Sequence, residues 1–153
     1  MEIVIDDLTG SEVIGLLEAH VAEMRAVTVN PESVHALDLD GLRRPEVTFW
    51  SLRDGDRIAG CGAIKRLDAS HAEIKSMRTA DGYQRRGVAA SLLAHIEAES
   101  VRMGLTRLSL ETGSEDFFAP ARALYVRSGF EYCAPFADYV LDPLSVFMTK
   151  KIA

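Results

Sequence analysis

A loop that could bind an anion lies between Gln84 and Ala89. It carries Arg85, Arg86 and Gly87 directly before a stretch that is predicted to be helical. The first turn of a helix presents unpaired backbone N–H groups and the positive end of the helix dipole, so it favours a negatively charged ligand. This combination of residues and position is typical of a phosphate-binding site.

The loop does not match the two most common glycine-rich phosphate motifs. A dinucleotide-binding loop needs the pattern G-x-G-x-x-G, and a P-loop needs a lysine and a hydroxyl residue after its last glycine. Here Val88 and Ala89 follow Gly87. Both motifs are therefore excluded, and the loop on its own fits either a phosphate site or a polar turn that starts a helix.

Two separate motifs resemble those of the GCN5-related N-acetyltransferases, the GNAT family. In the first, Gln84, Gly87 and Ala89 occupy the fixed positions of the family's Gln/Arg-x-x-Gly-x-Gly/Ala loop. The second lies further along the chain and consists of Ala121, Leu124, Tyr125, Gly129 and Phe130. Two motifs at the expected separation are far more specific than one short motif. The resemblance covers nearly the whole chain.

The resemblance implies that acetyl-coenzyme A is the cosubstrate and that the loop holds its pyrophosphate. Gly87 would let the backbone approach the phosphates closely, and the small Ala89 would avoid crowding them. The loop residues that the resemblance assigns to coenzyme binding are Gln84, Arg85, Arg86, Gly87, Val88 and Ala89.

A strand expected from His71 to Thr79 provides the rest of the coenzyme site in this family. There the strand splays from its neighbour, and the amide-bearing pantetheine arm adds to the sheet like an extra strand. By the resemblance, Met77 and Thr79 supply backbone hydrogen bonds to that arm. The N–H of Met77 would lie near the thioester carbonyl and stabilise the oxyanion formed on attack.

The resemblance gives Tyr125 the role of general acid for the departing thiolate of the coenzyme. A phenol with a pKa of about 10 can protonate a thiolate with a pKa of about 8.5 at neutral pH. Without the surrounding motif, a buried structural tyrosine would be the better interpretation.

Glu73 and Glu111 are the candidates for the general base, because an amine is mostly protonated at neutral pH and must lose a proton. Both are predicted to lie on strands that border the site, and neither position is given by a motif. Glu111 is favoured because it lies at the end of its strand beside Thr112. A carboxylate in a surface ion pair is the alternative for both residues.

The composition and charge of the chain indicate which class of protein it belongs to. The chain has 153 residues, of which 48% are apolar and 26% are charged, as expected for one globular domain over residues 1–153. A net charge of −6 argues against a nucleic-acid partner. No apolar run is long enough to span a membrane and the first residues lack the pattern of a signal peptide, so a cytoplasmic protein is expected.

Basic residues are concentrated in the segments nearest the proposed phosphate site, and we expect them to form one patch against an acidic remainder. They are Lys65, Arg66, Lys75, Arg78, Arg85 and Arg86. The two cysteines and four histidines show no metal-ligand spacing, so no metal is expected. Cys61 is interpreted as a core residue of a strand rather than a nucleophile.

The chain is predicted to have a mixed α/β (α+β) fold like that of the GNAT acyltransferases. In this fold, helices flank a central mixed sheet. Strands are expected at residues 2–6, 47–52, 57–67, 71–79, 107–112, 130–133 and 145–150. Helices are expected after a capping box at residues 9–12, after Asn30 and Pro31, from Gly87 to about Met103, and from Pro120 to just before Gly129. The strand, helix and strand between residues 71 and 112 imply a right-handed crossover and parallel neighbours.

The resemblance implies an N-acetyltransferase that works by direct transfer, without a covalent enzyme intermediate. The expected acceptor is the primary amine of a small molecule, an amino acid or related metabolite. A late acidic and aromatic loop with Phe136, Asp138, Tyr139 and Asp142 is expected to border the acceptor pocket. Three alternatives stay open: an acetyltransferase for protein lysine or N-terminal amines, a non-catalytic acetyl-coenzyme A sensor, and an interaction domain with no ligand. Dimers are frequent in the family, so the oligomeric state also stays open, with a homodimer as one alternative.

Overall fold

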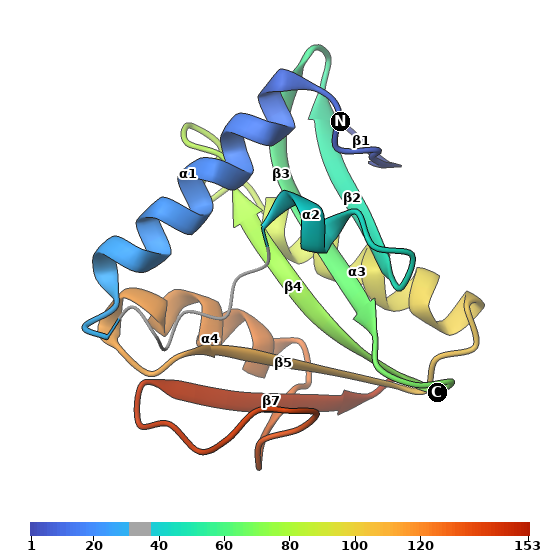
Figure 1. Cartoon of the computed structure of the whole chain (residues 1–153). Helices are drawn as coiled ribbons and strands as arrows, with labels where there is room; N and C mark the ends of the chain where they lie inside the picture. Colours follow the sequence, from blue (N-terminus) through green and yellow to red (C-terminus); the bar gives the residue numbers. More distant parts are fainter. Residues whose placement is uncertain (31–37) are drawn as a thin grey trace.

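A mixed β-sheet forms the centre of the protein (Figure 1). The computed structural model describes residues 1–30 and 38–153, and the helix start predicted at Asn30 and Pro31 runs into residues that lie outside these ranges. In sheet order the strands of the described part are β1 (Glu2–Ile5), β2 (Val47–Asp54), β3 (Arg57–Arg66), β4 (His71–Thr79), β5 (Arg107–Gly113), β7 (Ser145–Lys151) and β6 (Glu131–Cys133). The predicted strands are therefore confirmed, with ends that differ by at most two residues.

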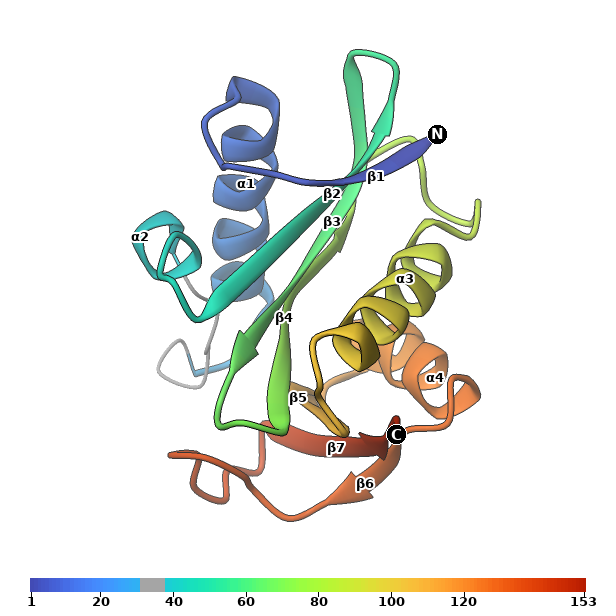
Figure 2. The same ribbon diagram turned by 90° about the vertical axis from the view of Figure 1, so that its right-hand side faces the viewer.

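Helices cover both faces of the sheet (Figure 2). On one face lie α1 (Ser11–Val27) and α2 (Leu39–Leu42), and on the other lie α3 (Val88–Arg102) and α4 (Ala119–Arg127). A short 3₁₀ turn, η2 (Asp116–Phe118), leads into α4. The crossover through α3 makes β4 and β5 parallel, as predicted, whereas the other neighbouring pairs are antiparallel.

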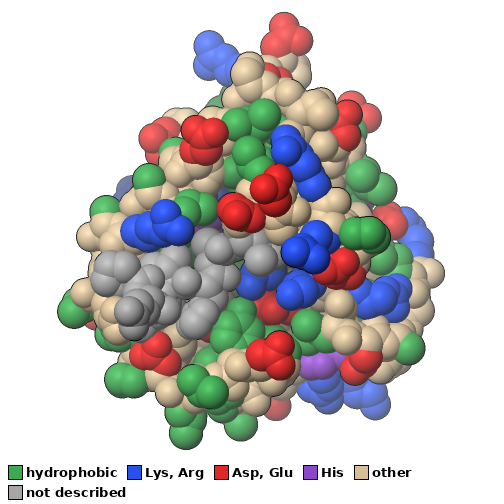
Figure 3. All heavy atoms as spheres, in the orientation of Figure 1, with side chains coloured by type: hydrophobic (Ala, Val, Ile, Leu, Met, Phe, Trp, Pro, Cys, Tyr) green, Lys and Arg blue, Asp and Glu red, His purple; other side chains and the backbone are tan. Residues whose placement is uncertain are grey.

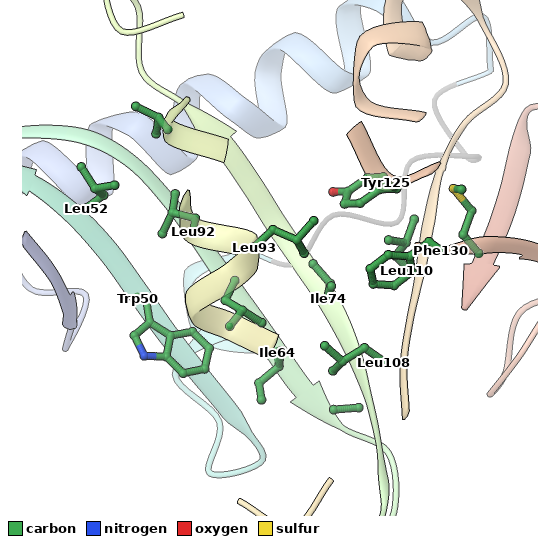
Figure 4. Close-up of a cluster of buried hydrophobic side chains, with 14 of the residues drawn as sticks. Trp50, Leu52, Ile64, Ile74, Leu92, Leu93, Leu108, Leu110, Tyr125 and Phe130 are labelled. Atoms are coloured by element: carbon green, nitrogen blue, oxygen red, sulfur yellow. The ribbon is translucent and has the colours of Figure 1, made fainter. Parts of the chain in front are cut away.

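The larger hydrophobic core fills the space between the sheet and the helices α3 and α4 (Figure 4). Leu92, Leu93 and Ile96 of α3 are at most 1% exposed and pack towards Ile64 and Ile74 of the sheet. Apolar residues recur along α3 at three- and four-residue spacing, as is typical of a helix with one buried face. Burial of these side chains fixes α3, and with it the loop that precedes the helix, against the sheet.

The start of α1 differs from the prediction. The helix has Gly10 as its N-cap and no side-chain cap, so the expected capping box of residues 9–12 does not form. The Thr9 hydroxyl instead donates to Asp7, and the Glu12 carboxylate accepts a hydrogen bond from Arg53 at 2.9 Å. Both groups of the expected box therefore have other partners, one of them on a distant strand.

The strands β4 and β5 separate after a short paired region, and this separation opens the sheet (Figure 1). Pairing runs only from His71 and Arg107 to Glu73 and Ser109. Beyond it, the register between β3 and β4 shifts, and Ser76 adopts a left-handed backbone conformation with φ of +57°. A bulge of this kind bends the strand and re-aims the residues that follow it.

Two glycines of β3 allow the bulged strand and α3 to pack closely. A Cβ atom at Gly62 would meet the Met77 sulfur, and one at Gly60 would lie 2.8 Å from the Arg78 carbonyl oxygen and 2.6 Å from a Val88 methyl carbon. Glycine within a strand is typical of a bulge or of close approach by another group, and both occur here.

We expect Gly60→Ala to destabilise the fold by about 1–3 kcal/mol, because the added methyl group has no room beside a backbone carbonyl. Thermal unfolding should show a melting temperature lowered by roughly 2–10 °C. Gly15→Ala is the matched control, since Gly15 lies on α1 with nothing within 4 Å of an added Cβ. That control should gain about 0.5–1 kcal/mol, and a Gly60→Ala protein at least as stable as the wild type would contradict the packing described here.

Candidate active site

A cavity of about 390 Å³ opens where β4 and β5 diverge. Its walls come from α1, β4, β5, η2 and α4. Three of the predicted catalytic residues, Met77, Glu111 and Tyr125, line it together although they are far apart in sequence. A concave site that collects titratable side chains from several elements is the usual setting for catalysis.

Tyr125 lies on α4 and is 6% exposed. Its ring packs edge-on against Phe130 with centroids 5.7 Å apart, and Figure 4 shows the hydroxyl pointing towards β4. Burial raises the pKa of the Tyr125 phenol above its usual range. The side chain therefore stays protonated at neutral pH, which is the state that a proton donor needs.

Glu111 lies on β5 opposite Phe147 of β7 and faces the cavity. Burial raises the pKa of this carboxyl to about 7, and the nearby Ser145 hydroxyl and Lys75 ammonium only partly offset that effect. A group with a pKa close to neutrality can both take up and release a proton under working conditions. Glu111 therefore has the properties of a general base.

Glu73 also lines the cavity but is held in a hydrogen-bond network. Its carboxylate accepts from the Tyr139 hydroxyl at 2.5 Å and from the Lys75 ammonium at 3.2 Å, and it is 4% exposed. Lys75 also donates to the Tyr139 oxygen at 3.1 Å. Tyr139, whose ring packs against Phe136, therefore lies behind the cavity wall. The cavity lining includes none of the four loop residues expected to border it, which are Phe136, Asp138, Tyr139 and Asp142.

The loop before α3 has the geometry of an open helix N-terminus. Gly87 is the N-cap with φ of +76°, a left-handed conformation that favours glycine, and no side chain caps the helix. Gln84 bridges the loop internally, accepting from the Gly82 N–H and donating to Asp81. The first N–H groups of α3 therefore have no side-chain partner among the described residues and can donate hydrogen bonds to an anion.

The predicted coenzyme residues fall into two groups in the structure. Met77, Thr79 and Gln84 line the cavity. The others do not line it but surround the start of α3, and they are Arg85, Arg86, Gly87, Val88 and Ala89. Val88 is buried in the core, whereas Arg86 lies over the Tyr83 ring with its guanidinium carbon 5.1 Å from the centroid.

The prediction of a single basic patch is wrong. Arg66 donates to the carbonyl of Met103 after the C-terminal end of α3, whereas Arg86 lies before its N-terminal end. Lys75 and Arg78 are paired with Glu73 and Glu23. Figure 3 shows basic and acidic side chains interspersed on one face of the molecule.

Residues of α1 complete the cavity wall, and the sequence did not indicate them. His20 and Glu23 line the cavity beside Arg78 of β4, and the Arg78 guanidinium donates to Glu23 at 2.8 Å. No sequence pattern relates α1 to β4, so this contact could not be predicted from the sequence.

Cys61 is fully buried in the smaller core under α1 and α2, and burial raises the pKa of its thiol to about 12. Its sulfur donates to the Ser76 carbonyl, 3.3 Å away. The interpretation of Cys61 as a core residue is confirmed, since a thiol in this state is not nucleophilic.

Two further observations concern metal ions and membrane-spanning helices. Over residues 1–30 and 38–153, no three histidine, cysteine or acidic side chains gather in a group suited to a metal ion. Among the described helices, none combines the length and the apolar character needed to cross a bilayer.

Comparisons with known proteins give one consistent assignment. The family model described as "Acetyltransferase (GNAT) family" matches residues 10–130. The uncharacterized N-acetyltransferase YsnE of Bacillus subtilis is 57% identical over 99% of this chain and 100% of its own length. An IAA acetyltransferase of Azospirillum brasilense is 40% identical over 79% of this chain and 78% of its own length.

A solved structure shows the same fold. The crystal structure of a candidate acyl-CoA N-acyltransferase from Klebsiella pneumoniae is 31% identical and superposes with a TM-score of 0.83, covering 99% of this chain and 97% of its own. The divergent strands, the open helix N-terminus and the buried tyrosine thus occur in a chain that matches the family in both sequence and fold. This chain belongs to the GNAT family and is an N-acetyltransferase.

Proposed function

We propose that residues 1–153 act as one domain that transfers the acetyl group of acetyl-coenzyme A to the primary amine of a small molecule, an amino acid or related metabolite. The observation that carries this proposal is the cavity at the strand divergence. There a strand with unpaired backbone, a carboxyl with a pKa of about 7 and a protonated phenol border one space.

The coenzyme would bind along the open edge of β4. Its pantetheine arm would pair with the backbone of Met77 and Thr79, which have no partner on β5. Its pyrophosphate would lie on the first N–H groups of α3, from Gly87 to Ala89, with Gln84, Arg85 and Arg86 around it. The thioester carbonyl would then lie beside the Met77 N–H, which stabilises the negative oxygen during attack.

Proton transfers would divide between two groups. The amine nitrogen attacks the acetyl carbon, and Glu111 takes the proton that the nitrogen loses. The carbon–sulfur bond breaks, and Tyr125 gives its proton to the leaving thiolate. Glu111 suits the base better than Glu73, because Lys75 and Tyr139 already occupy the Glu73 carboxylate.

A small acceptor fits the size of the site. The cavity measures about 390 Å³, which is within the range of small-molecule pockets. The relative that is named an IAA acetyltransferase supports a small-molecule acceptor as well.

Release of free thiol from acetyl-coenzyme A, measured with a panel of amino acids, polyamines and peptides, tests the proposal. We expect acceptor-dependent release by the wild type and a kcat reduced by about 10²-fold or more in Tyr125→Phe, because the thiolate then leaves without a proton donor. Tyr132→Phe is the control, since Tyr132 is 58% exposed on β6. Equal kcat values in wild type and Tyr125→Phe would remove Tyr125 from the acid role.

The pH profile of kcat/KM tests the role of Glu111. A base must be unprotonated to act, so kcat/KM should rise with pH through about 7. This pH is well below the pKa of an ordinary amine, which is about 10. Glu111→Gln should lower kcat/KM by about 10²–10⁴-fold and abolish the rise near 7. If Glu73→Gln removes that rise while Glu111→Gln keeps it, the base assignment must be reversed.

Coenzyme binding by the start of α3 is tested with Gly87→Glu. The added carboxylate repels phosphate and blocks close approach, so calorimetric affinity for coenzyme A should fall at least roughly tenfold. Gly104→Glu is the matched control, because Gly104 follows the other end of α3, has a similar φ of +84° and has nothing within 4 Å of an added Cβ. Equal loss in both variants would mean that strain at a left-handed position, rather than the phosphate site, causes the effect.

A further inference from the structure

Three buried polar atoms border the cavity without a hydrogen-bond partner in the described part of the chain. They are Nδ1 of His20, the hydroxyl of Ser76 and Nε of Arg78. His20 is only 7% exposed and belongs to α1, whereas Ser76 and Arg78 flank Met77 on β4. Buried polar groups in native proteins nearly always have partners, so three unpaired ones on one cavity indicate that a polar ligand or water binds there.

The chemistry of these atoms limits what that ligand can be. Nε of arginine can only donate a hydrogen bond, and a serine hydroxyl and a neutral histidine can also donate. Burial lowers the pKa of His20 to about 4, so its ring is neutral at pH 7. A group that can only accept hydrogen bonds complements three donors. A carboxylate is such a group, because its two oxygens carry enough lone pairs to accept from all three.

Glu23 holds Arg78 in the orientation that leaves Nε unpaired. The carboxylate of Glu23 accepts from one terminal nitrogen of the guanidinium at 2.8 Å, and the Arg78 side chain is 14% exposed. The ion pair neutralises part of the arginine charge but does not use Nε. Directed donors, rather than excess positive charge, would therefore select the ligand.

The same cavity also has an acceptor for the amino group of a ligand. Glu111 lines it from β5, whereas the carboxylate of Glu73 is already bonded to Lys75 and Tyr139. One space thus offers an acceptor for an amino group and donors for a carboxylate. A ligand that carries both groups complements it better than a simple amine or a simple acid.

We propose that His20, Ser76 and Arg78 form a carboxylate subsite, so that the acceptor is an amine that also carries a carboxylate, as amino acids do. This inference rests on the proposed function, because it takes the cavity to be the acceptor site. The carboxylate binds beside Met77 on the α1 side of β4, which leaves the amino group within the part of the cavity that Glu111 borders.

Matched acceptors test the subsite. Standard amino acids would be compared with their primary amides and with the amines that lack the carboxylate, by thiol release at saturating acetyl-coenzyme A. For the wild type, kcat/KM should be at least about tenfold higher for the acid than for its amide, the value of one charge-assisted hydrogen bond. Arg78→Met should remove this preference, with a loss of about 10- to 100-fold for the acid and little change for the amide or for the KM of acetyl-coenzyme A.

Two more variants distinguish loss of the subsite from a general folding defect. His20→Phe keeps a buried ring of similar size but removes Nδ1, and it should reduce the preference for acids in the same direction. Arg25→Met removes an exposed arginine of the same helix and should leave every value unchanged. A wild type that uses amides as well as acids, or an Arg78→Met protein that loses both equally, would overturn the subsite.

Calorimetric binding of the same acceptors to the coenzyme A complex separates this inference from the proposed function. If no acceptor releases thiol, the proposed acetylation fails, yet acids that bind while amides do not would still support the subsite. If amines are acetylated without any preference for a carboxylate, the proposed function stands and the subsite is wrong.

Discussion

The loss of pairing between β4 and β5 is the constraint on which the rest of the site depends. Pairing stops at Glu73 and Ser109, and the bulge at Ser76 turns β4 away from its neighbour. Backbone N–H and C=O groups left without a strand partner are costly unless water or a ligand satisfies them. The sheet therefore contains a position for one more extended chain, and this is where the amide-bearing arm of the coenzyme is proposed to bind.

The bulge is held in place from both sides of the strand. Gly62 makes room for the Met77 side chain towards α3, and the thiol of Cys61 donates to the Ser76 carbonyl. A residue other than glycine with positive φ costs about 1–3 kcal/mol and persists only where its surroundings fix it. Residues with no direct part in chemistry, including the buried cysteine, thus determine where the Met77 N–H points.

Local pattern predicted the strands, because the strand period is a local property. The resemblance carried by the two motifs predicted Met77 and Tyr125, which meet in the cavity. Contacts between distant elements were not predictable in this way. The expected patch of basic residues fails since Arg66 and Arg86 lie at opposite ends of α3, and Arg78 pairs with Glu23 on a helix 55 positions away in sequence. The cap of α1 fails for the same reason, because Arg53 of β2 engages Glu12.

The arrangement of helices on the two faces also bears on the order of events in a catalytic cycle. The start of α3, where the pyrophosphate is proposed to bind, and the α1 wall with His20 belong to helices on opposite faces of the sheet (Figure 2). On that placement, coenzyme and acceptor approach from different sides and meet only at the gap beside β4. Neither blocks the entrance of the other, so both would occupy the enzyme together before any product leaves, and the kinetics would be sequential rather than ping-pong.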